Sequence, residues 1–119
     1  MVISEFKRAL ASTREVQITV TGRKSGRKIS IPVWFVHEAD RVYLLPVEGS
    51  ESDWYKNLVR TPVMDLSAKR ARITTEPKLI TDAIKVKEVA EKFRAKYGAA
   101  EVKKYYSKFD VCVEVSPAS

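Results

Sequence analysis

The sequence has 119 residues, 45% hydrophobic and 31% charged, which is typical of one globular domain and too short for a second catalytic domain. Its 22 lysines and arginines outnumber the 15 acidic residues and give a net charge of +7, which favours an anionic partner without identifying it. The single cysteine cannot form an intramolecular disulfide, no apolar run approaches the roughly 20 residues of a membrane span, and residues 1–5 lack a secretory signal, so we expect a cytoplasmic protein without a membrane partner.

The first part of the chain is predicted to form a helix followed by a three-stranded meander. Apolar residues at helical spacing indicate a helix over residues 3–12, and strict alternation indicates a half-buried strand over residues 16–21. Residues 28–37 are rich in Ile, Val, Trp and Phe, which is typical of a strand buried on both faces. After a turn, residues 41–47 resume strand character.

The second part of the chain alternates helices with three further strands. A short helix that Ser52 or Asp53 caps is predicted before Thr61 and Pro62, followed by strands over residues 63–68 and 72–80. Residues 82–97 form an amphipathic helix pattern that begins at Asp82 and ends at Gly98. A short helix over residues 99–107 and a last strand over residues 109–115 complete the chain.

This order of elements predicts a mainly β fold with flanking helices. Six mostly sequential strands with brief helices between them favour a closed or half-closed antiparallel barrel over a doubly wound parallel sheet, which needs a crossover helix after nearly every strand. We therefore expect one domain over residues 1–119, with an N-terminal helix at 3–12 and C-terminal helices at 82–107.

The turn at residues 22–28, with the sequence GRKSGRK, is the clearest candidate binding feature. It holds four cations, one hydroxyl and two glycines in seven residues. Glycines let backbone amides turn toward a ligand, and sheltered Arg or Lys side chains form charge-assisted hydrogen bonds of about 1.5–3 kcal/mol each. A phosphate cradle and a solvated hairpin tip are both compatible with this pattern.

Known catalytic constellations are absent from the sequence. His37 and Cys112 are the sole histidine and cysteine, so no metal site or His-dependent triad is expected. We interpret Cys112 as a small buried side chain. Trp34, Trp54 and Tyr55 are suited either to stacking on a ring system or to core packing.

Two motifs resemble the deazaflavin-dependent nitroreductase family. They are TGRKSG at residues 21–26 with Pro32 and Val33 after it, and Asp-Trp-Tyr-x-Asn-Leu at residues 53–58 before Pro62. The resemblance covers roughly residues 15–80. That family belongs to the FMN-binding split β-barrels related to pyridoxamine phosphate oxidase, so the resemblance implies a six-stranded antiparallel split β-barrel.

The resemblance also implies a set of cofactor contacts. In the family the basic turn grips the cofactor phosphate and, for the deazaflavin coenzyme F-420, its oligoglutamate tail. The cofactor-binding residues implied here are Arg23, Lys24, Ser25, Gly26, Lys28, Pro32, Val33, Trp34, Trp54 and Asn57. Ile29 stands where the family has an arginine, which Arg27 or Lys28 would have to replace. FMN and F-420 both stay open as the cofactor.

The function that the resemblance implies is a nitroreductase-like oxidoreductase that transfers hydride between the bound cofactor and a small electrophilic substrate. A homodimer with the cofactor between subunits is expected. No catalytic residue is assigned, although Tyr55 or Tyr97 could donate a proton. Two alternatives are a non-catalytic flavin-binding or anion-binding barrel and a nucleic-acid-binding barrel. The second is disfavoured because most aromatic residues lie in strongly apolar runs.

Overall fold

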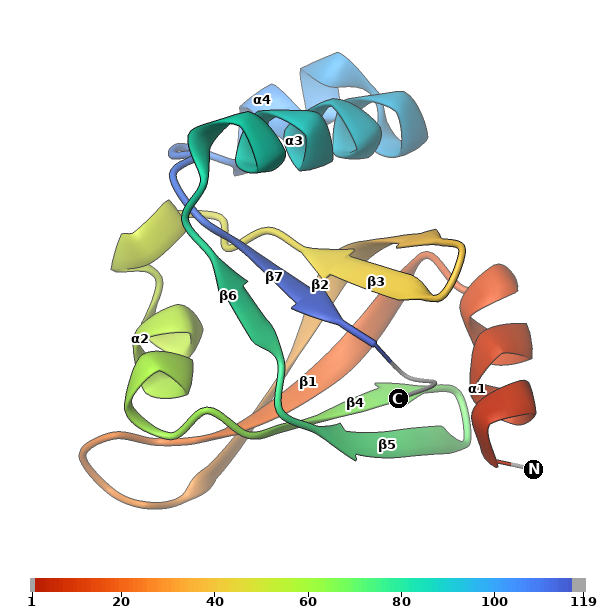
Figure 1. The fold of residues 1–119 in the computed structure, drawn as a ribbon, viewed down its shortest axis with the longest axis vertical. Coiled ribbons are helices and arrows are strands. Elements are labelled where there is room, and N and C mark those ends of the chain that lie inside the picture. Colours follow the sequence, from red (N-terminus) through yellow and green to blue (C-terminus); the bar gives the residue numbers. More distant parts are fainter. Residues whose placement is uncertain (1, 117–119) are drawn as a thin grey trace.

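The computed structural model describes residues 2–116 (Figure 1). The elements, in chain order, are α1 (Val2–Ala11), β1 (Glu15–Thr21), β2 (Lys28–Glu38), β3 (Arg41–Leu44), the 3-10 helix η1 (Gly49–Glu51), α2 (Asp53–Arg60), β4 (Met64–Ala68), β5 (Ala71–Thr75), β6 (Lys78–Ile80), α3 (Ala83–Tyr97), α4 (Ala99–Tyr105) and β7 (Cys112–Val115). No helix within the described residues is long and apolar enough to cross a membrane.

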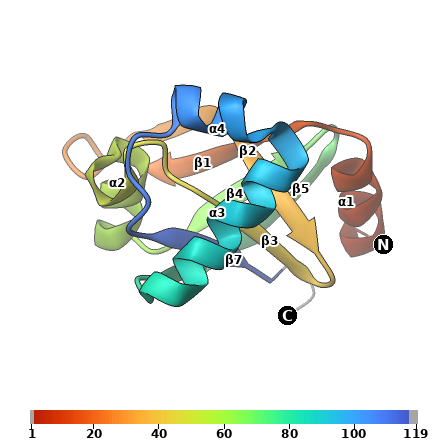
Figure 2. The same ribbon diagram turned by 90° about the horizontal axis from the view of Figure 1, so that it is seen from above.

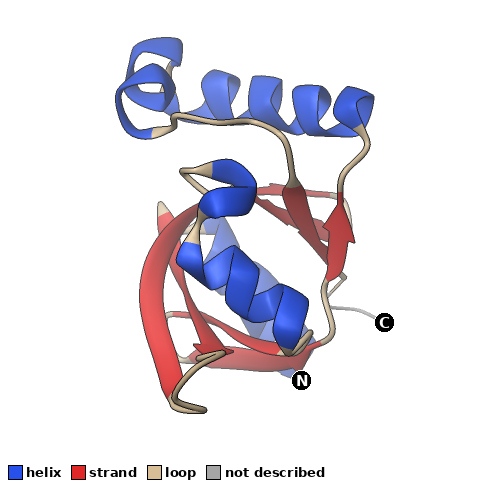
Figure 3. Ribbon diagram, turned by 90° about the vertical axis from the view of Figure 1, so that its left-hand side faces the viewer, coloured by secondary structure: helices blue, strands red, loops and turns tan. Residues whose placement is uncertain are grey.

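The strands form a curled antiparallel half-barrel in the order β5-β4-β1-β2-β3-β7-β6. Strand β2 joins the two halves, because its residues 28–34 pair with β1 and its residues 35–38 pair with β3. Figure 2 shows α3 and α4 lying over one end of the sheet, and Figure 3 shows its curvature. This confirms a mainly β antiparallel fold with flanking helices.

Two hydrophobic cores stabilise the sheet. The first fills its concave side and packs α1 and α2 against the strands. Its fully buried members include Phe6, Ile18, Phe35, Leu44, Leu58 and Leu66. The second lies between the sheet and the C-terminal helices, and it includes Val86, Val89, Phe93, Tyr97, Tyr106 and Cys112. The amphipathic stripe predicted for residues 82–97 therefore faces the sheet, and Cys112 is buried as predicted, which raises the pKa of its thiol to about 11.

The structure corrects the predicted strand over residues 72–80. Two strands occupy this segment, β5 paired with β4 and β6 paired with β7, so the sheet has seven strands rather than six. Pro77 lies at the break. Because proline has no backbone N–H to donate to a ladder, the chain changes partner strands at this point.

The prediction that residues 28–37 are buried on both faces is also wrong for most of the strand. Only Phe35 and Val36 are buried, whereas Lys28 to Ser30 and Pro32 are exposed. The exposed part is the segment that pairs with β1 and extends beyond α3 and α4. An apolar strand that is open to solvent on one side offers a surface for a ligand or for another chain.

Candidate functional site

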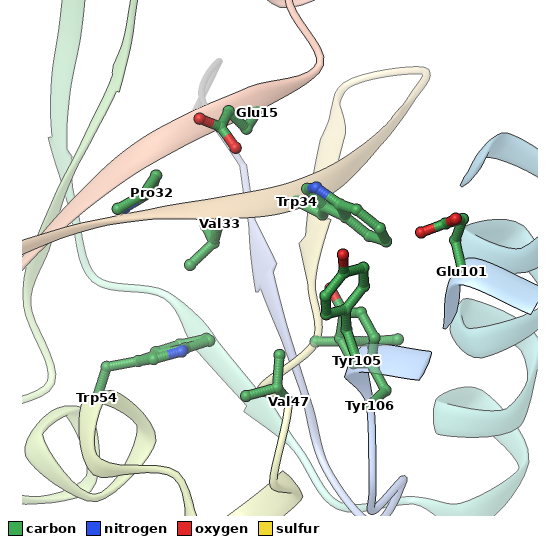
Figure 4. A pocket seen from close by; sticks show the side chains of 10 residues that line it. Glu15, Pro32, Val33, Trp34, Val47, Trp54, Glu101, Tyr105 and Tyr106 are labelled. Atoms are coloured by element: carbon green, nitrogen blue, oxygen red, sulfur yellow. The ribbon is translucent and has the colours of Figure 1, made fainter. Parts of the chain in front are cut away.

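Of the pockets that β2 lines, two contain predicted site residues, one at the beginning of the strand and one near its middle. The tip pocket has a volume of about 280 Å³ and is lined by Gly22, Arg23, Lys24, Ser25, Ile29, Asp53 and Asn57. The aromatic pocket has a volume of about 390 Å³ and is lined by Glu15, Pro32, Val33, Trp34, Leu45, Val47, Trp54, Glu101, Tyr105 and Tyr106 (Figure 4).

The tip pocket is built on a tight turn between β1 and β2. The Gly22 amide donates to the Arg27 carbonyl at 2.8 Å, and the Gly26 amide donates to the Gly22 carbonyl at 2.9 Å. Gly26 has a φ of +73°, a conformation that other residues rarely adopt. A Cβ at Gly22 would lie 2.9 Å from the Ser25 hydroxyl oxygen, which would have to move to make room for it. Of the two glycines of the motif, Gly26 is therefore the one whose backbone conformation favours glycine.

Asn57 ties this turn to α2. Its side chain is 4% exposed, and its Oδ1 accepts hydrogen bonds from the Arg23 backbone amide at 3.1 Å and from the Arg23 guanidinium at 2.7 Å. The same guanidinium reaches the Asp53 carboxylate at 3.2 Å. Arg23 and Asn57, both predicted as cofactor contacts, are therefore bonded to each other and fix the position of the turn.

The remaining polar groups of the turn are available to an anion. Among residues 2–116, no ion pair is formed by Lys24 or Arg27, and the backbone amides of Lys24 and Ser25 have no hydrogen-bond partner. Free amides next to cationic side chains are a common arrangement for binding phosphate. Lys28 instead donates to the Thr21 hydroxyl at 3.1 Å and does not line the tip pocket.

The aromatic pocket is organised around Trp34. The Trp34 ring stacks on Tyr97 at a centroid distance of 4.2 Å and an interplanar angle of 7°, and its edge meets Tyr105 at 5.6 Å. Trp54, from the first turn of α2, lies on the opposite side of the pocket from Trp34 and Tyr105, at the left of Figure 4. Val33 of β2 points toward it. The pocket therefore combines side chains from β2, α2 and α4.

The tyrosines suggested as proton donors do not line the aromatic pocket. The Tyr97 hydroxyl accepts from the Phe35 amide at 3.1 Å and lies 2.6 Å from the Arg14 carbonyl, so it holds the backbone together; burial raises its pKa. Tyr55 is also buried, and burial raises its pKa as well. Tyr105, by contrast, is 52% exposed, lines the pocket and has no hydrogen-bond partner for its hydroxyl within the described residues.

Hydrogen bonds, which we call the latch, join Val47 and Ser50 of the loop before α2 to Ser107 and Asp110 of the segment after α4. Ser107 donates its amide to the Val47 carbonyl at 2.8 Å, and the Asp110 carboxylate accepts from both the amide and the hydroxyl of Ser50, at 2.9 and 2.5 Å. These hydrogen bonds lower the pKa of Asp110. Because Val47 and Tyr105 both line the aromatic pocket, the latch fixes two of its walls relative to each other.

A comparison with models of protein families assigns the chain to one family. The family model described as "Uncharacterized protein conserved in bacteria (DUF2255)" matches residues 7–111. The chain belongs to this family. No curated protein matches it.

Solved structures share the fold at low sequence identity. One described as a domain-swapped dimer is 19% identical, with a TM-score of 0.66 and 96% of each chain covered. An F420-H2-dependent reductase (FDR-A) is 18% identical, with a TM-score of 0.62 and 86% of this chain and 93% of that chain covered. A Listeria innocua protein provisionally described as a pyridoxamine 5′-phosphate oxidase is 11% identical, with a TM-score of 0.69 and coverages of 96% and 91%. The split-barrel fold implied by the sequence motifs is confirmed.

The structure sorts the predicted contacts into two groups. Arg23, Lys24, Ser25 and Asn57 line the tip pocket, and Pro32, Val33, Trp34 and Trp54 line the aromatic pocket, whereas Gly26 and Lys28 line neither. Sequence reasoning missed the lining residues Glu15, Leu45, Val47, Glu101, Tyr105 and Tyr106. The adjacent tyrosines Tyr105 and Tyr106, near the end of the helix predicted over residues 99–107, were the one feature of the sequence that could have indicated these lining residues.

Proposed function

We propose that this protein is an oxidoreductase that binds FMN or the deazaflavin coenzyme F-420 and transfers hydride between that cofactor and a small electrophilic substrate. The observation that carries the proposal is the position of two chemically different pockets on one strand. From Ile29 to Val33, β2 advances roughly 13 Å at about 3.3 Å per residue. This arrangement suits an extended ligand with a phosphate at one end and a flat ring at the other.

The groups of the basic turn are suited to the phosphate end. Lys24 and Arg27 would supply charge, and the amides of Lys24 and Ser25 would donate hydrogen bonds. Arg23 already bonds to Asn57, so its main role would be to orient the turn while it contributes positive charge nearby. Ile29, at the position of the family's arginine, gives the tip pocket an apolar wall instead of a further cation.

The aromatic pocket is suited to the ring and the substrate. When bound, a flavin-type cofactor supplies the hydride chemistry, and the chain's own residues orient it and exclude water. Trp34 would present a flat surface that Tyr97 holds in place, and Trp54 would close the opposite side. Tyr105 would be the proton donor to the substrate, because its hydroxyl is accessible and has no hydrogen-bond partner within the described residues.

A homodimer is part of the proposal. Ile29 and Val47 are each 40% exposed and lie at the two pockets, so a second copy could bury them and cover a bound cofactor. A solved structure of similar fold described as a domain-swapped dimer supports this proposal. Sedimentation equilibrium with and without cofactor would measure the association directly.

The test is a titration of purified protein with FMN and, separately, with F-420, in which cofactor fluorescence and protein melting temperature are followed together. Micromolar binding of either cofactor should raise the melting temperature, because a ligand at 100 times its Kd stabilises the folded state by about 2.7 kcal/mol. No response to either cofactor would contradict the proposal. Binding without turnover of any electrophile would instead favour the non-catalytic flavin-binding alternative.

A further inference from the structure

The aromatic pocket differs in charge from three other pockets of this basic protein. In each of those three pockets the cations outnumber a single carboxylate: the tip pocket has Arg23 and Lys24 with Asp53, a pocket beside α1 has Arg8, Lys69 and Arg70 with Glu5, and a pocket between α1 and α3 has Lys92 and Lys96 with Glu38. The aromatic pocket has no cation among its lining residues but has two carboxylates, Glu15 and Glu101. In a chain with a net charge of +7, this reversal of sign is local and specific.

The two carboxylates are free to interact with a ligand. Both side chains are exposed, and neither forms an ion pair among residues 2–116. Figure 4 shows them on either side of Trp34, at the rim of the pocket. Glu15 lies directly across the β1–β2 ladder from Trp34, and Glu101 projects from α4. Two different elements therefore place negative charge at the same opening.

The walls of the pocket are suited to a positive charge as well. Cations attract the faces of aromatic rings, and tryptophan is the strongest acceptor. Two tyrosine rings at this site already have a cation of the protein over them: Arg14 lies 5.2 Å from the ring centroid of Tyr97, which stacks on Trp34, and Lys104 lies 5.3 Å from that of the lining residue Tyr105. Within the described part of the chain, no cation lies over Trp34 or Trp54. Trp54 is only 7% exposed and Tyr97 covers one face of Trp34, so an external cation would meet the part of each ring that lines the pocket.

We propose that the aromatic pocket binds a small, flat organic cation, such as a quaternised or protonated nitrogen heterocycle. Trp34 and Trp54 would contact its ring, and Glu15 and Glu101 would balance its charge. The basic turn and the acidic rim would then select groups of opposite charge at two points of one strand. This inference goes beyond the proposed redox function and does not depend on it, because it concerns binding to the flavin-free protein.

Calorimetric titration of flavin-free protein with two probes of nearly the same shape would test the inference. N-methylquinolinium carries a fixed positive charge, and 1-methyl-2-quinolone is neutral. We expect the cation to bind at least about tenfold more tightly, and the preference to fall as ionic strength rises, because the carboxylates are exposed to solvent. Equal affinity for the two probes, or no detectable binding of the cation at millimolar concentration, would overturn the inference.

Charge-removing variants locate the site. Glu101→Gln alone should weaken binding of the cation by about two- to fivefold, as expected for a solvent-exposed charge pair, and the double variant Glu15→Gln/Glu101→Gln should remove most of the preference over the neutral probe. Glu76→Gln is the matched control, because Glu76 is exposed and lines neither the aromatic pocket nor the three basic ones. An unchanged preference in the double variant, with a normal melting temperature, would contradict the inference.

The experiments distinguish failure of the cation site from failure of the redox proposal. If the cation binds and neither FMN nor F-420 does, the redox proposal fails and the cation site stands. If a flavin binds and the charged probe has no advantage over the neutral one, the reverse holds.

Discussion

The tip pocket and the aromatic pocket are held in shape by different kinds of contact. The turn at residues 22–28 is shaped by hydrogen bonds of Gly22 and Gly26 within the turn, and one long-range contact, with the buried Asn57 of α2, fixes its position. The aromatic pocket is long-range structure, because Trp34 is stacked on Tyr97 of α3 and touches Tyr105 of α4. A binding loop can be recognised in a sequence, whereas a pocket assembled from distant helices needs the fold. Substitutions in one of these regions test whether the other region is affected.

The largest effect is expected for Asn57→Ala. This change removes both acceptor contacts to Arg23 and leaves a part-buried backbone amide without a partner, so it should lower the free energy of unfolding by about 2–3 kcal/mol. Urea denaturation measures the loss. Because the aromatic pocket does not contain Asn57, binding of a neutral aromatic probe below the unfolding transition should be unchanged.

Asn57→Asp is the matched control for this change. It retains an oxygen acceptor at the same position and adds a favourable charge beside the Arg23 guanidinium, so it should recover most of the lost stability. If Asn57→Asp were as unstable as Asn57→Ala, the hydrogen bonds to Arg23 would not explain the role of Asn57.

A smaller effect is expected at the aromatic pocket from Tyr97→Phe. The ring stack with Trp34 survives, but the Phe35 amide loses its partner, which should cost about 1–2 kcal/mol of unfolding free energy.

The variant Tyr105→Phe removes an exposed hydroxyl and should change stability by less than about 0.5 kcal/mol. In a turnover assay with a cofactor, Tyr105→Phe should be slower than Tyr97→Phe. If Tyr97→Phe were the slower variant, Tyr105 would be excluded as the proton donor.

A further small effect on stability is expected for Asp110→Asn, and it should depend on pH. Hydrogen bonds from Ser50 lower the pKa of Asp110 below 3.8, so its stabilising contribution is present above that pH and is lost as pH falls through the lower folded-state value. The side chain is 37% exposed, so screening should hold the contribution to about 1 kcal/mol or less.

The measurement is the stability difference between wild type and Asp110→Asn across the acid range. The comparison is needed because the pKa of Asp65 is lowered too, so acid unfolding of the wild type alone does not isolate Asp110. The difference should be constant between about pH 5 and 8 and should shrink below pH 3.8. A difference that grew with acid would contradict the assignment of the Ser50–Asp110 latch.

Local signals predicted most of the fold. Alternation located β1, and the cap at Asp82, which accepts from the Lys85 amide at 2.9 Å, located α3. The same signals failed where partners decide the structure. The apolar run before Phe35 reads as buried in isolation, yet the helices cover only its end, and nothing local to Pro77 shows that the chain leaves β4 for β7.

The candidate site was predictable to a similar extent. The basic turn and the tryptophans could be named from motifs, because those residues are close in sequence or belong to a family pattern. The walls supplied by Glu101 and Tyr105 could not, since they reach Trp34 only after α3 and α4 have folded across the sheet. Nor could the hydrogen bonds between Arg23 and Asn57, which lie 34 positions apart.

The most direct test of the two-pocket account is to compare binding of FMN with binding of riboflavin, which lacks the phosphate, to wild type, Lys24→Ala and the control Lys87→Ala. Lys87 is exposed on α3 and lines neither pocket on β2. The account predicts that Lys24→Ala weakens FMN by about 1–3 kcal/mol and leaves riboflavin and the melting temperature unchanged. Equal losses for both ligands, or no loss for either, would contradict the assignment of the turn to the phosphate.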